Sequence, residues 1–345
     1  FGVGNGFAAS PIDGQLAMAM SGDGLLYDRK SGKVLAAYSG YENGASAAAY
    51  SPEGDTFALA SVGGVITIFD ASTLDAMSSF DVGGTPFAMN YSLDGTRLAI
   101  GTADKRDSVL VVIDAASGAE MHRWGDYVGD ITGVVFDPSG EYILTSAIDG
   151  IVRIYGLAQG QFLGGVHNSD YGLRALAIMP KKPVLAIAEA EVVVVKDIAS
   201  GENLAQFDIG VSPIALAFAP AGDLFVGYVD GAILQWRIGQ AEPIARFIAH
   251  DHQVTALAVS ADGARLYSSS EGDAMITWRL QHEGTLEPSE EGYSNGVALG
   301  LDDQGRLIRV GPADGGAIVT RADRKNIFLP LASPFVDAGL SNDMI

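Results

Sequence analysis

A short turn motif recurs eight times along this chain of 345 residues. The copies read SPIDG, SPEG, SLDG, DPSG, MPKK, APAG, SADG and LDDQG, and their last residues stand at positions 14, 54, 95, 140, 182, 222, 263 and 305. Successive copies are therefore 40 to 45 residues apart. A near-constant period of this length indicates that the chain is built from copies of one structural unit.

Each copy predicts four short β-strands. Over 45–80, for example, apolar and polar residues alternate with a period of two, in runs separated by turn residues. Glycine supplies the positive φ that closes a tight hairpin, and Asp or Ser before it can hydrogen-bond the local backbone. A four-stranded sheet buries both of its faces only against neighbouring sheets, so the copies are expected to stack around an axis.

The sequence therefore predicts an all-β fold, an eight-bladed β-propeller of four-stranded antiparallel blades. The alternative is seven blades plus an irregular terminal unit. We expect a single propeller domain over 1–331, followed by a C-terminal tail over 332–345. The repeats are predicted at 1–40, 41–82, 83–126, 127–166, 167–208, 209–248, 249–291 and 292–331.

Charge and composition exclude several classes of function. The chain has 42 Asp and Glu against 21 Lys and Arg, a net charge of −21. The resulting negative potential disfavours phosphate backbones and anionic membranes, so nucleic acid is not an expected partner. The absence of Cys excludes disulfides, thiolate metal ligands and Cys nucleophiles. No apolar run approaches the roughly 20 residues that cross a bilayer, so no membrane span is predicted.

The repeats resemble those of two propeller families. The stretch AHDHQVTALAVSADGARLYSSSEGDAMITWRL, at 249–280, is similar to a WD40 repeat. FDVGGTPFAMNYSLDGTRLAIG at 80–101 and FDIGVSPIALAFAPAGDLFVG at 207–227 resemble the YVTN-type bacterial repeat. No copy has an intact Trp-Asp pair, because that position reads YD, FD, ID, YG, KD, WR, WR and TR in order. The repeats are thus identified as degenerate and of bacterial type.

The WD40 resemblance implies a structural tetrad in the seventh repeat, formed by His250, Ser268, Asp273 and Trp278. Asp273 stands one residue closer to the Trp than the family pattern asks. A Ser, His and Asp set also suggests a hydrolase, but no nucleophile elbow or oxyanion donor accompanies it. His250 and His252 have no recognisable third partner for a metal. We therefore predict no catalytic residue, no metal site and no cofactor.

Carboxylates recur in the turns between the second and third strands of the repeats, which places them on one rim of the disc. We expect this electronegative rim to contact a partner. Arg106 lies in an enlarged turn on the same rim and interrupts its charge pattern. The predicted partner-binding residues are Asp23, Asp104, Arg106, Asp149 and Asp230.

The predicted function is that of a non-enzymatic platform for protein–protein interaction, or of a structural subunit of a larger assembly, with the tail 332–345 as a possible docking arm. The alternative is a cofactor-bearing periplasmic propeller of the quinoprotein dehydrogenase type, because DRKSG, DAASG and DIASG resemble a motif of that family. YVTN-like features, the lack of Cys and a first residue other than Met favour export in a bacterium. The cytoplasm is the alternative.

Overall fold

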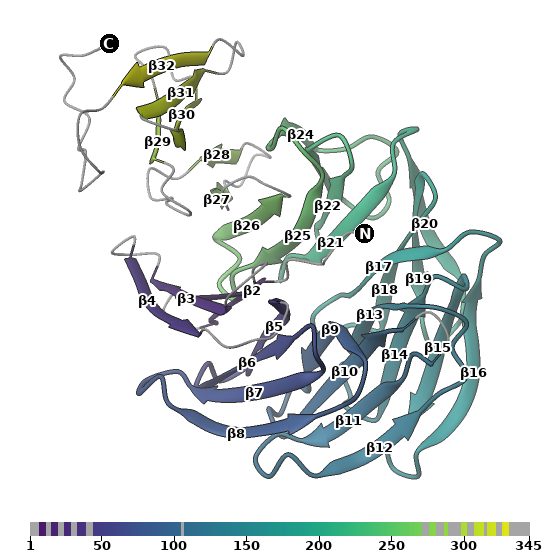
Figure 1. Ribbon diagram of the computed structural model, residues 1–345. Helices are drawn as coiled ribbons and strands as arrows, with labels where there is room; N and C mark the ends of the chain where they lie inside the picture. Colours follow the sequence, from purple (N-terminus) through teal and green to yellow (C-terminus); the bar gives the residue numbers. More distant parts are fainter. Residues whose placement is uncertain are drawn as a thin grey trace.

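The described part of the chain consists of β-strands joined by turns (Figure 1). A computed structural model describes residues 7–11, 15–19, 24–28, 33–38, 44–104, 107–270, 276–280, 286–288, 298–301, 307–313, 316–321 and 326–330. Every sheet has four antiparallel strands that pair in chain order, as a meander does. Within the described residues, no helix is long and apolar enough to cross a membrane.

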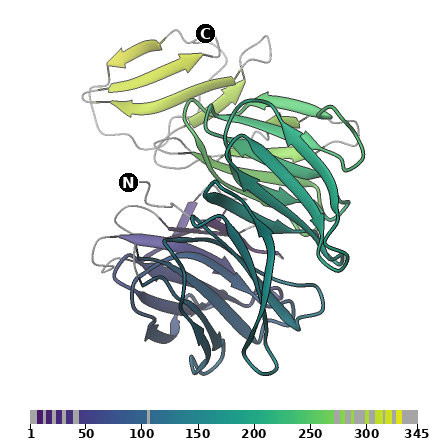
Figure 2. The ribbon, with the colours of Figure 1, turned by 90° about the vertical axis from the view of Figure 1, so that its right-hand side faces the viewer.

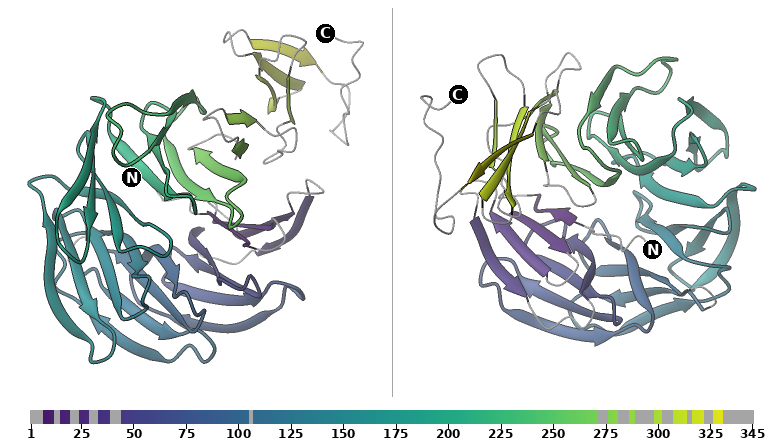
Figure 3. Two further views of the ribbon diagram at one scale, coloured as in Figure 1. Left: turned by 180° about the vertical axis from the view of Figure 1, so that it is seen from behind. Right: turned by 45° about the horizontal axis from the view of Figure 1, so that its top comes forward.

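Six blades of four strands follow one another around a common axis, and both views of Figure 3 show their order. They are β5 (Ala45–Tyr50), β6 (Thr56–Ser61), β7 (Val65–Asp70) and β8 (Ala76–Asp81); β9 (Thr85–Tyr91), β10 (Arg97–Ala103), β11 (Leu110–Asp114) and β12 (Glu120–Trp124); β13 (Ile131–Phe136), β14 (Tyr142–Ala147), β15 (Ile151–Gly156) and β16 (Gln161–Asn168); β17 (Leu173–Ile178), β18 (Val184–Glu189), β19 (Val192–Asp197) and β20 (Asn203–Asp208); β21 (Pro213–Phe218), β22 (Leu224–Tyr228), β23 (Ala232–Trp236) and β24 (Ala245–Ile248); β25 (Val254–Val259), β26 (Arg265–Ser270), β27 (Ile276–Leu280) and β28 (Leu286–Pro288).

The number of blades corrects the prediction from the sequence. The structure shows six blades, so both the eight-bladed ring and the alternative of seven blades plus an irregular terminal unit are wrong. The first and last repeats form two further four-stranded sheets (Figure 2). A repeated turn motif predicts hairpins, but the number of sheets that pack as blades depends on tertiary contacts outside the repeat. These sheets are β1 (Phe7–Ala9), β2 (Gln15–Ala19), β3 (Gly24–Asp28) and β4 (Lys33–Tyr38), and β29 (Ala298–Leu301), β30 (Leu307–Ala313), β31 (Gly316–Arg321) and β32 (Asn326–Pro330).

The recurring turn closes the first hairpin of a blade through a serine. In the blade β9–β12, the Ser92 hydroxyl donates to the Asp94 carboxylate at 2.6 Å and accepts from the backbone N–H of Arg97 at 3.0 Å. Gly95 follows with a φ of 68°, a conformation that costs glycine little. These hydrogen bonds lower the pKa of Asp94 to about 2, chiefly through Ser92. The turn chemistry in the sequence therefore fixes the hairpin directly.

The core lies between the blades. The innermost strands of successive blades contact one another, from β5 against β9 to β21 against β25. One buried cluster joins Ala60 and Ile66 of the first blade to Leu98 and Val111 of the next. Complete burial of such a Leu or Ile side chain stabilises the fold by about 1.5 to 3 kcal/mol. The alternation in each repeat thus places apolar residues on both faces of a blade.

The outer strand β12 ties its blade to both neighbours. The His122 Nε2 atom is hydrogen-bonded to the carbonyl oxygen of Leu157 at 2.7 Å. The indole N–H of Trp124 donates to the carbonyl oxygen of Gly160 at 2.8 Å, and Arg123 donates to the carbonyl oxygen of Val82 at 3.2 Å. Blade β9–β12 and its two neighbours are therefore held together at their periphery as well as in their core.

Candidate functional site

Three of the four tetrad residues lie together in the blade β25–β28. His250, in the loop before β25, has its Nε2 atom 2.7 Å from the hydroxyl oxygen of Ser268 on β26. The indole N–H of Trp278 on β27 donates to the same hydroxyl oxygen at 2.9 Å. All three side chains are buried, and Asp273 lies outside the described residues. A hydroxyl enclosed in this way can link strands, but it offers no position for a substrate.

Blade β13–β16 builds the corresponding link from different residues. The Tyr127 hydroxyl, at the place of His250, is 3.0 Å from the Thr145 hydroxyl, at the place of Ser268. Tyr155 takes the place of Trp278 and pairs with Ile143 as Trp278 pairs with Leu266. Burial raises the pKa of Tyr127 well above its ordinary value, so the phenol stays neutral. This link was not predicted from the sequence, because tyrosine does not occur in the family pattern.

Asp149, one of the predicted rim carboxylates, forms an ion pair with Arg153. Arg153 on β15 donates two hydrogen bonds to it, at 2.7 and 3.0 Å, and its guanidinium carbon lies 4.7 Å from the centre of the Tyr127 ring. Burial lowers the pKa of Arg153, but the hydrogen bond and the charge of Asp149 outweigh it and the pKa is raised. Asp149 therefore holds a turn and does not contribute a free negative charge.

The other predicted rim residues lie in separate turns. Asp104 follows β10, where its carbonyl oxygen accepts from the Ser108 hydroxyl at 2.7 Å. Asp230 follows β22, where its carboxylate accepts from the backbone N–H of Ala232 at 3.0 Å and lies 3.5 Å from Arg246. Asp23 and Arg106 lie outside the described residues. Asp104, Asp149 and Asp230 thus lie in turns of three different blades, and the partner-binding rim stays a prediction.

An exposed apolar surface lies on the same rim, next to Asp149. Its three large side chains are 76%, 47% and 63% exposed, and they come from the loop before β13, from the turn between β14 and β15 and from the loop before β17. We call this surface the apolar rim patch, and it consists of Val128, Ile148 and Tyr171. Contiguous exposed apolar patches often mark interaction sites. These residues can be recognised in the sequence, because each is a large apolar residue beside Asp or Gly in a loop.

Glycines let the three loops of the apolar rim patch approach one another. A Cβ atom on Gly129 would collide with the side chain of Ile148, and one on Gly172 would lie 2.9 Å from the Ile148 carbonyl oxygen. Gly150 has a φ of 82°, and a Cβ atom there would collide with the carbonyl oxygen of Ser169. Ile148 is therefore held between the loops that carry the other two members.

Hydrogen bonds fix these loops in place. The backbone N–H of Val128 donates to the Asp149 carboxylate at 3.3 Å. The backbone N–H of Ile148 donates to the carbonyl oxygen of Asp130 at 3.0 Å, and that of Ser169 donates to the carbonyl oxygen of Gly150 at 2.9 Å. Arg153 in turn fixes Asp149 through their ion pair. The patch is therefore preorganised, and less conformational entropy is lost when a partner binds.

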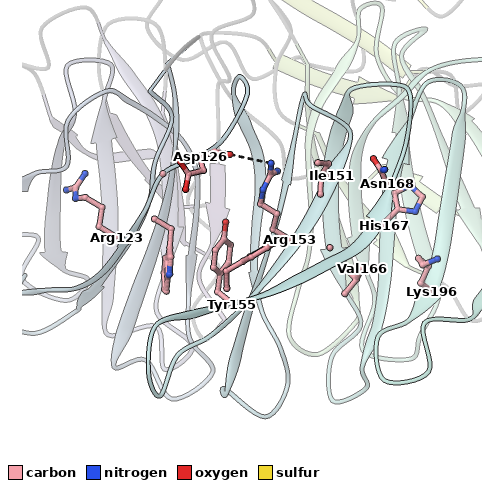
Figure 4. A pocket seen from close by; sticks show the side chains of 13 residues that line it. Arg123, Asp126, Ile151, Arg153, Tyr155, Val166, His167, Asn168 and Lys196 are labelled. Atoms are coloured by element: carbon pink, nitrogen blue, oxygen red, sulfur yellow. Dashed lines mark hydrogen bonds between the residues drawn. The ribbon is translucent and has the colours of Figure 1, made fainter.

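A groove of about 920 Å³ adjoins this rim and is lined by three successive blades. Asp126 comes from the loop after β12, Phe162 comes from β16 and Lys196 comes from β19. The carbonyl oxygen of Asp126 accepts from Arg153 at 3.5 Å, as the dashed line in Figure 4 shows. The lining mixes aromatic and charged groups, as surfaces that receive peptide side chains do. Within the described chain, no three His, Asp or Glu side chains are placed to hold a metal ion.

The motif that suggested a quinoprotein forms a local turn. The Asp114 carboxylate accepts from the backbone N–H and the hydroxyl of Ser117, at 2.8 and 2.6 Å. The Asp197 carboxylate accepts in the same way from Ser200, at 2.8 and 3.2 Å. The hydrogen bond from the Ser117 hydroxyl lowers the pKa of Asp114, and the hydrogen bond from the backbone N–H of Ser200 lowers the pKa of Asp197. In both places the motif stabilises a hairpin between the third and fourth strands.

The fold and the buried links between strands define a β-propeller built from degenerate repeats. The family model "WD domain, G-beta repeat" matches residues 121–156 and 241–278, which include most of the two linked blades. Two stretches of this β-propeller chain therefore match the WD40 repeat, in line with the resemblance found in the sequence. The bacterial and YVTN qualifiers stay predictions.

Known relatives are similar over parts of the chain. "Pre-mRNA-processing factor 19 homolog 2" of Arabidopsis thaliana is 24% identical over 60% of this chain and 41% of its own length. "Pre-rRNA-processing protein IPI3" of Mycosarcoma maydis is 38% identical over 23% of this chain and 14% of its own length. The chain spans less than half the length of either relative. A chain of the solved "Crystal Structure of Mitotic Checkpoint Complex" is similar with a TM-score of 0.73 at 16% identity, over 81% of this chain and 87% of that one. That similarity shows the fold.

Proposed function

We propose that this chain is a non-enzymatic platform for protein–protein interaction, and that the apolar rim patch is its contact surface. The observation that carries the proposal is that Val128, Ile148 and Tyr171 are exposed on one rim, in loops that hydrogen bonds hold in place. A few buried side chains, among which Trp, Tyr and Arg are the most frequent, contribute most of the binding energy of an interface, and Tyr171 is of this kind. Such side chains are costly to leave in water when they form one continuous surface.

The comparisons support this role in general terms. The relative from Arabidopsis is named as a processing factor, and the solved structure is titled as a complex. We extend to this chain only the general role of a partner within an assembly. The tail 332–345 lies outside the described residues, and its role as a docking arm stays part of the proposal. Export in a bacterium also stays a prediction, which fractionation of the native cells tests.

The test compares two matched double variants. The chain is purified with a tag from its native cells, and its partners are identified and counted by mass spectrometry. We expect a stoichiometric protein partner with the wild type and its loss with Val128→Ser/Tyr171→Ser. The control Met77→Ser/Leu93→Ser changes two side chains of similar exposure, on an outer strand and on the opposite rim.

Two results would contradict the proposal in different ways. If the wild-type chain brings down no stoichiometric partner, the platform function is wrong. If the partner is retained by the patch variant and lost with the control, the function stands and the surface is wrong. Circular dichroism of both variants confirms that the β-sheet fold is intact, since all four changed side chains are exposed.

A further inference from the structure

We propose that the apolar rim patch binds a basic peptide segment that carries at least one large apolar side chain. This inference rests on the proposed function and adds the chemistry of the partner. It follows from the charges around the patch, which the exposed apolar groups alone do not specify. The occupant is a segment of a different protein and not a second copy of this chain.

Each of the three loops that carry the patch also carries a carboxylate. Asp126 lies two residues before Val128 and is exposed, and Asp170 lies directly before Tyr171 and is also exposed. Asp130, half-buried, closes the first loop, and Arg174, the second residue of β17, is the cation that follows the third loop. The paired Asp149 adds no net charge, because Arg153 neutralises it. The three patch loops are therefore net negative, in line with the net charge of −21 for the whole chain, while Arg123 and Lys196 lie in the adjoining groove.

The apolar groups and the carboxylates select one kind of partner together. An apolar side chain that covers Ile148 removes it and its neighbours from water, which is favourable at about 25 cal/mol per Å². A Lys or Arg in the same segment can then pair with Asp126 or Asp170, which stand within two residues of a member of the patch. Complementary charges of this kind guide the encounter and disfavour wrong partners. A neutral segment gains only the apolar part, and an acidic segment is repelled.

Two other occupants fit the surface less well. A second copy of the chain brings the same carboxylates against the patch, and each copy carries a net charge of −21. An apolar–acidic segment has the same difficulty. Like charges brought together at an interface oppose binding. The carboxylates of the patch loops therefore disfavour both occupants and favour a basic segment.

Peptide selection tests the chemistry without assuming a sequence. A random twelve-residue peptide library is displayed on phage and selected against the wild-type chain, and against Val128→Ser/Tyr171→Ser in parallel. Peptides recovered only with the wild type depend on the patch. We expect these peptides to be enriched at least threefold in Lys and Arg over the library, with Leu, Phe or Trp as the apolar residue. Patch-dependent peptides without such enrichment would overturn the inference while leaving the proposed function intact.

Titration of one selected peptide then assigns the charge effect to named residues. We expect Asp126→Asn/Asp170→Asn to weaken binding by about 3- to 10-fold, as two exposed ion pairs do. The control Glu53→Gln/Glu141→Gln removes the same charge from exposed turns on the opposite rim. Equal weakening by both variants would show attraction to the chain's net charge alone and would overturn the inference. If no patch-dependent peptide is recovered at all, the surface named under the proposed function is wrong as well.

Discussion

The serine at the centre of the tetrad should be a strong determinant of stability. In the fold, the fully buried Ser268 hydroxyl accepts from the Trp278 indole N–H at 2.9 Å and is hydrogen-bonded to His250 at 2.7 Å. Ser268→Ala leaves both buried groups without this partner, and a buried unsatisfied group costs about 1 to 3 kcal/mol. We therefore expect the free energy of unfolding to fall by about 2 to 5 kcal/mol.

The measurement is equilibrium urea unfolding, followed by tryptophan fluorescence and by circular dichroism. Ser269→Ala is the matched control, because its hydroxyl is 3.0 Å from the Thr255 hydroxyl in a less buried position. We expect that change to cost less than about 1 kcal/mol. If the two variants lose the same stability, the tetrad is not an energetic link between strands and our reasoning fails. Binding to the apolar rim patch, on another blade, should be unchanged in folded Ser268→Ala.

Four further changes test other parts of the structure. Tyr127→Phe removes the hydrogen bond to Thr145 but keeps the ring beside Arg153, so urea unfolding should show a loss of about 1 kcal/mol. Arg153→Met leaves Asp149 buried without its partner and should cost about 2 to 4 kcal/mol, while the added change Asp149→Asn should recover part of it in a double-mutant cycle. The pKa of Asp94 in the folded state is about 2, below the ordinary 3.8, so the carboxylate stabilises the fold above about pH 4. The wild type should therefore have a higher free energy of unfolding than Asp94→Asn near neutral pH, and this difference should shrink as the pH falls towards 2. Urea unfolding at several pH values measures it. Gly150→Ala forces a side chain into a positive φ and against the next loop, so hydrogen exchange of the three patch loops should accelerate and peptide affinity should fall.

Much of the blade structure follows from local sequence. The alternation over 45–80 predicted the strands β5 to β8, because period-two patterns and turn residues act within one hairpin. The blade count does not follow from such patterns. The same turn motif occurs in the terminal repeats, yet the structure has six blades, because stacking depends on contacts between sheets that no single repeat contains.

The candidate site was only partly predictable. The family resemblance pointed to His250, Ser268 and Trp278, but the tyrosine link around Tyr127 had no pattern to match. Asp149 was interpreted as one member of a negative rim, whereas Arg153 neutralises it. That pair spans a turn, with Asp149 before Gly150 and Arg153 on β15, so the period-two pattern of a strand does not predict it.

The tyrosine link also connects stability with recognition. Tyr127 is covalently next to Val128, and its neighbour Arg153 holds the carboxylate that fixes the Val128 backbone. A genetic screen for variants that lose the partner should therefore recover interior residues such as Tyr127 and Thr145 alongside the exposed ones. Such variants would remain folded in their other blades, so their defect would be read as a lost contact although no contact residue had changed.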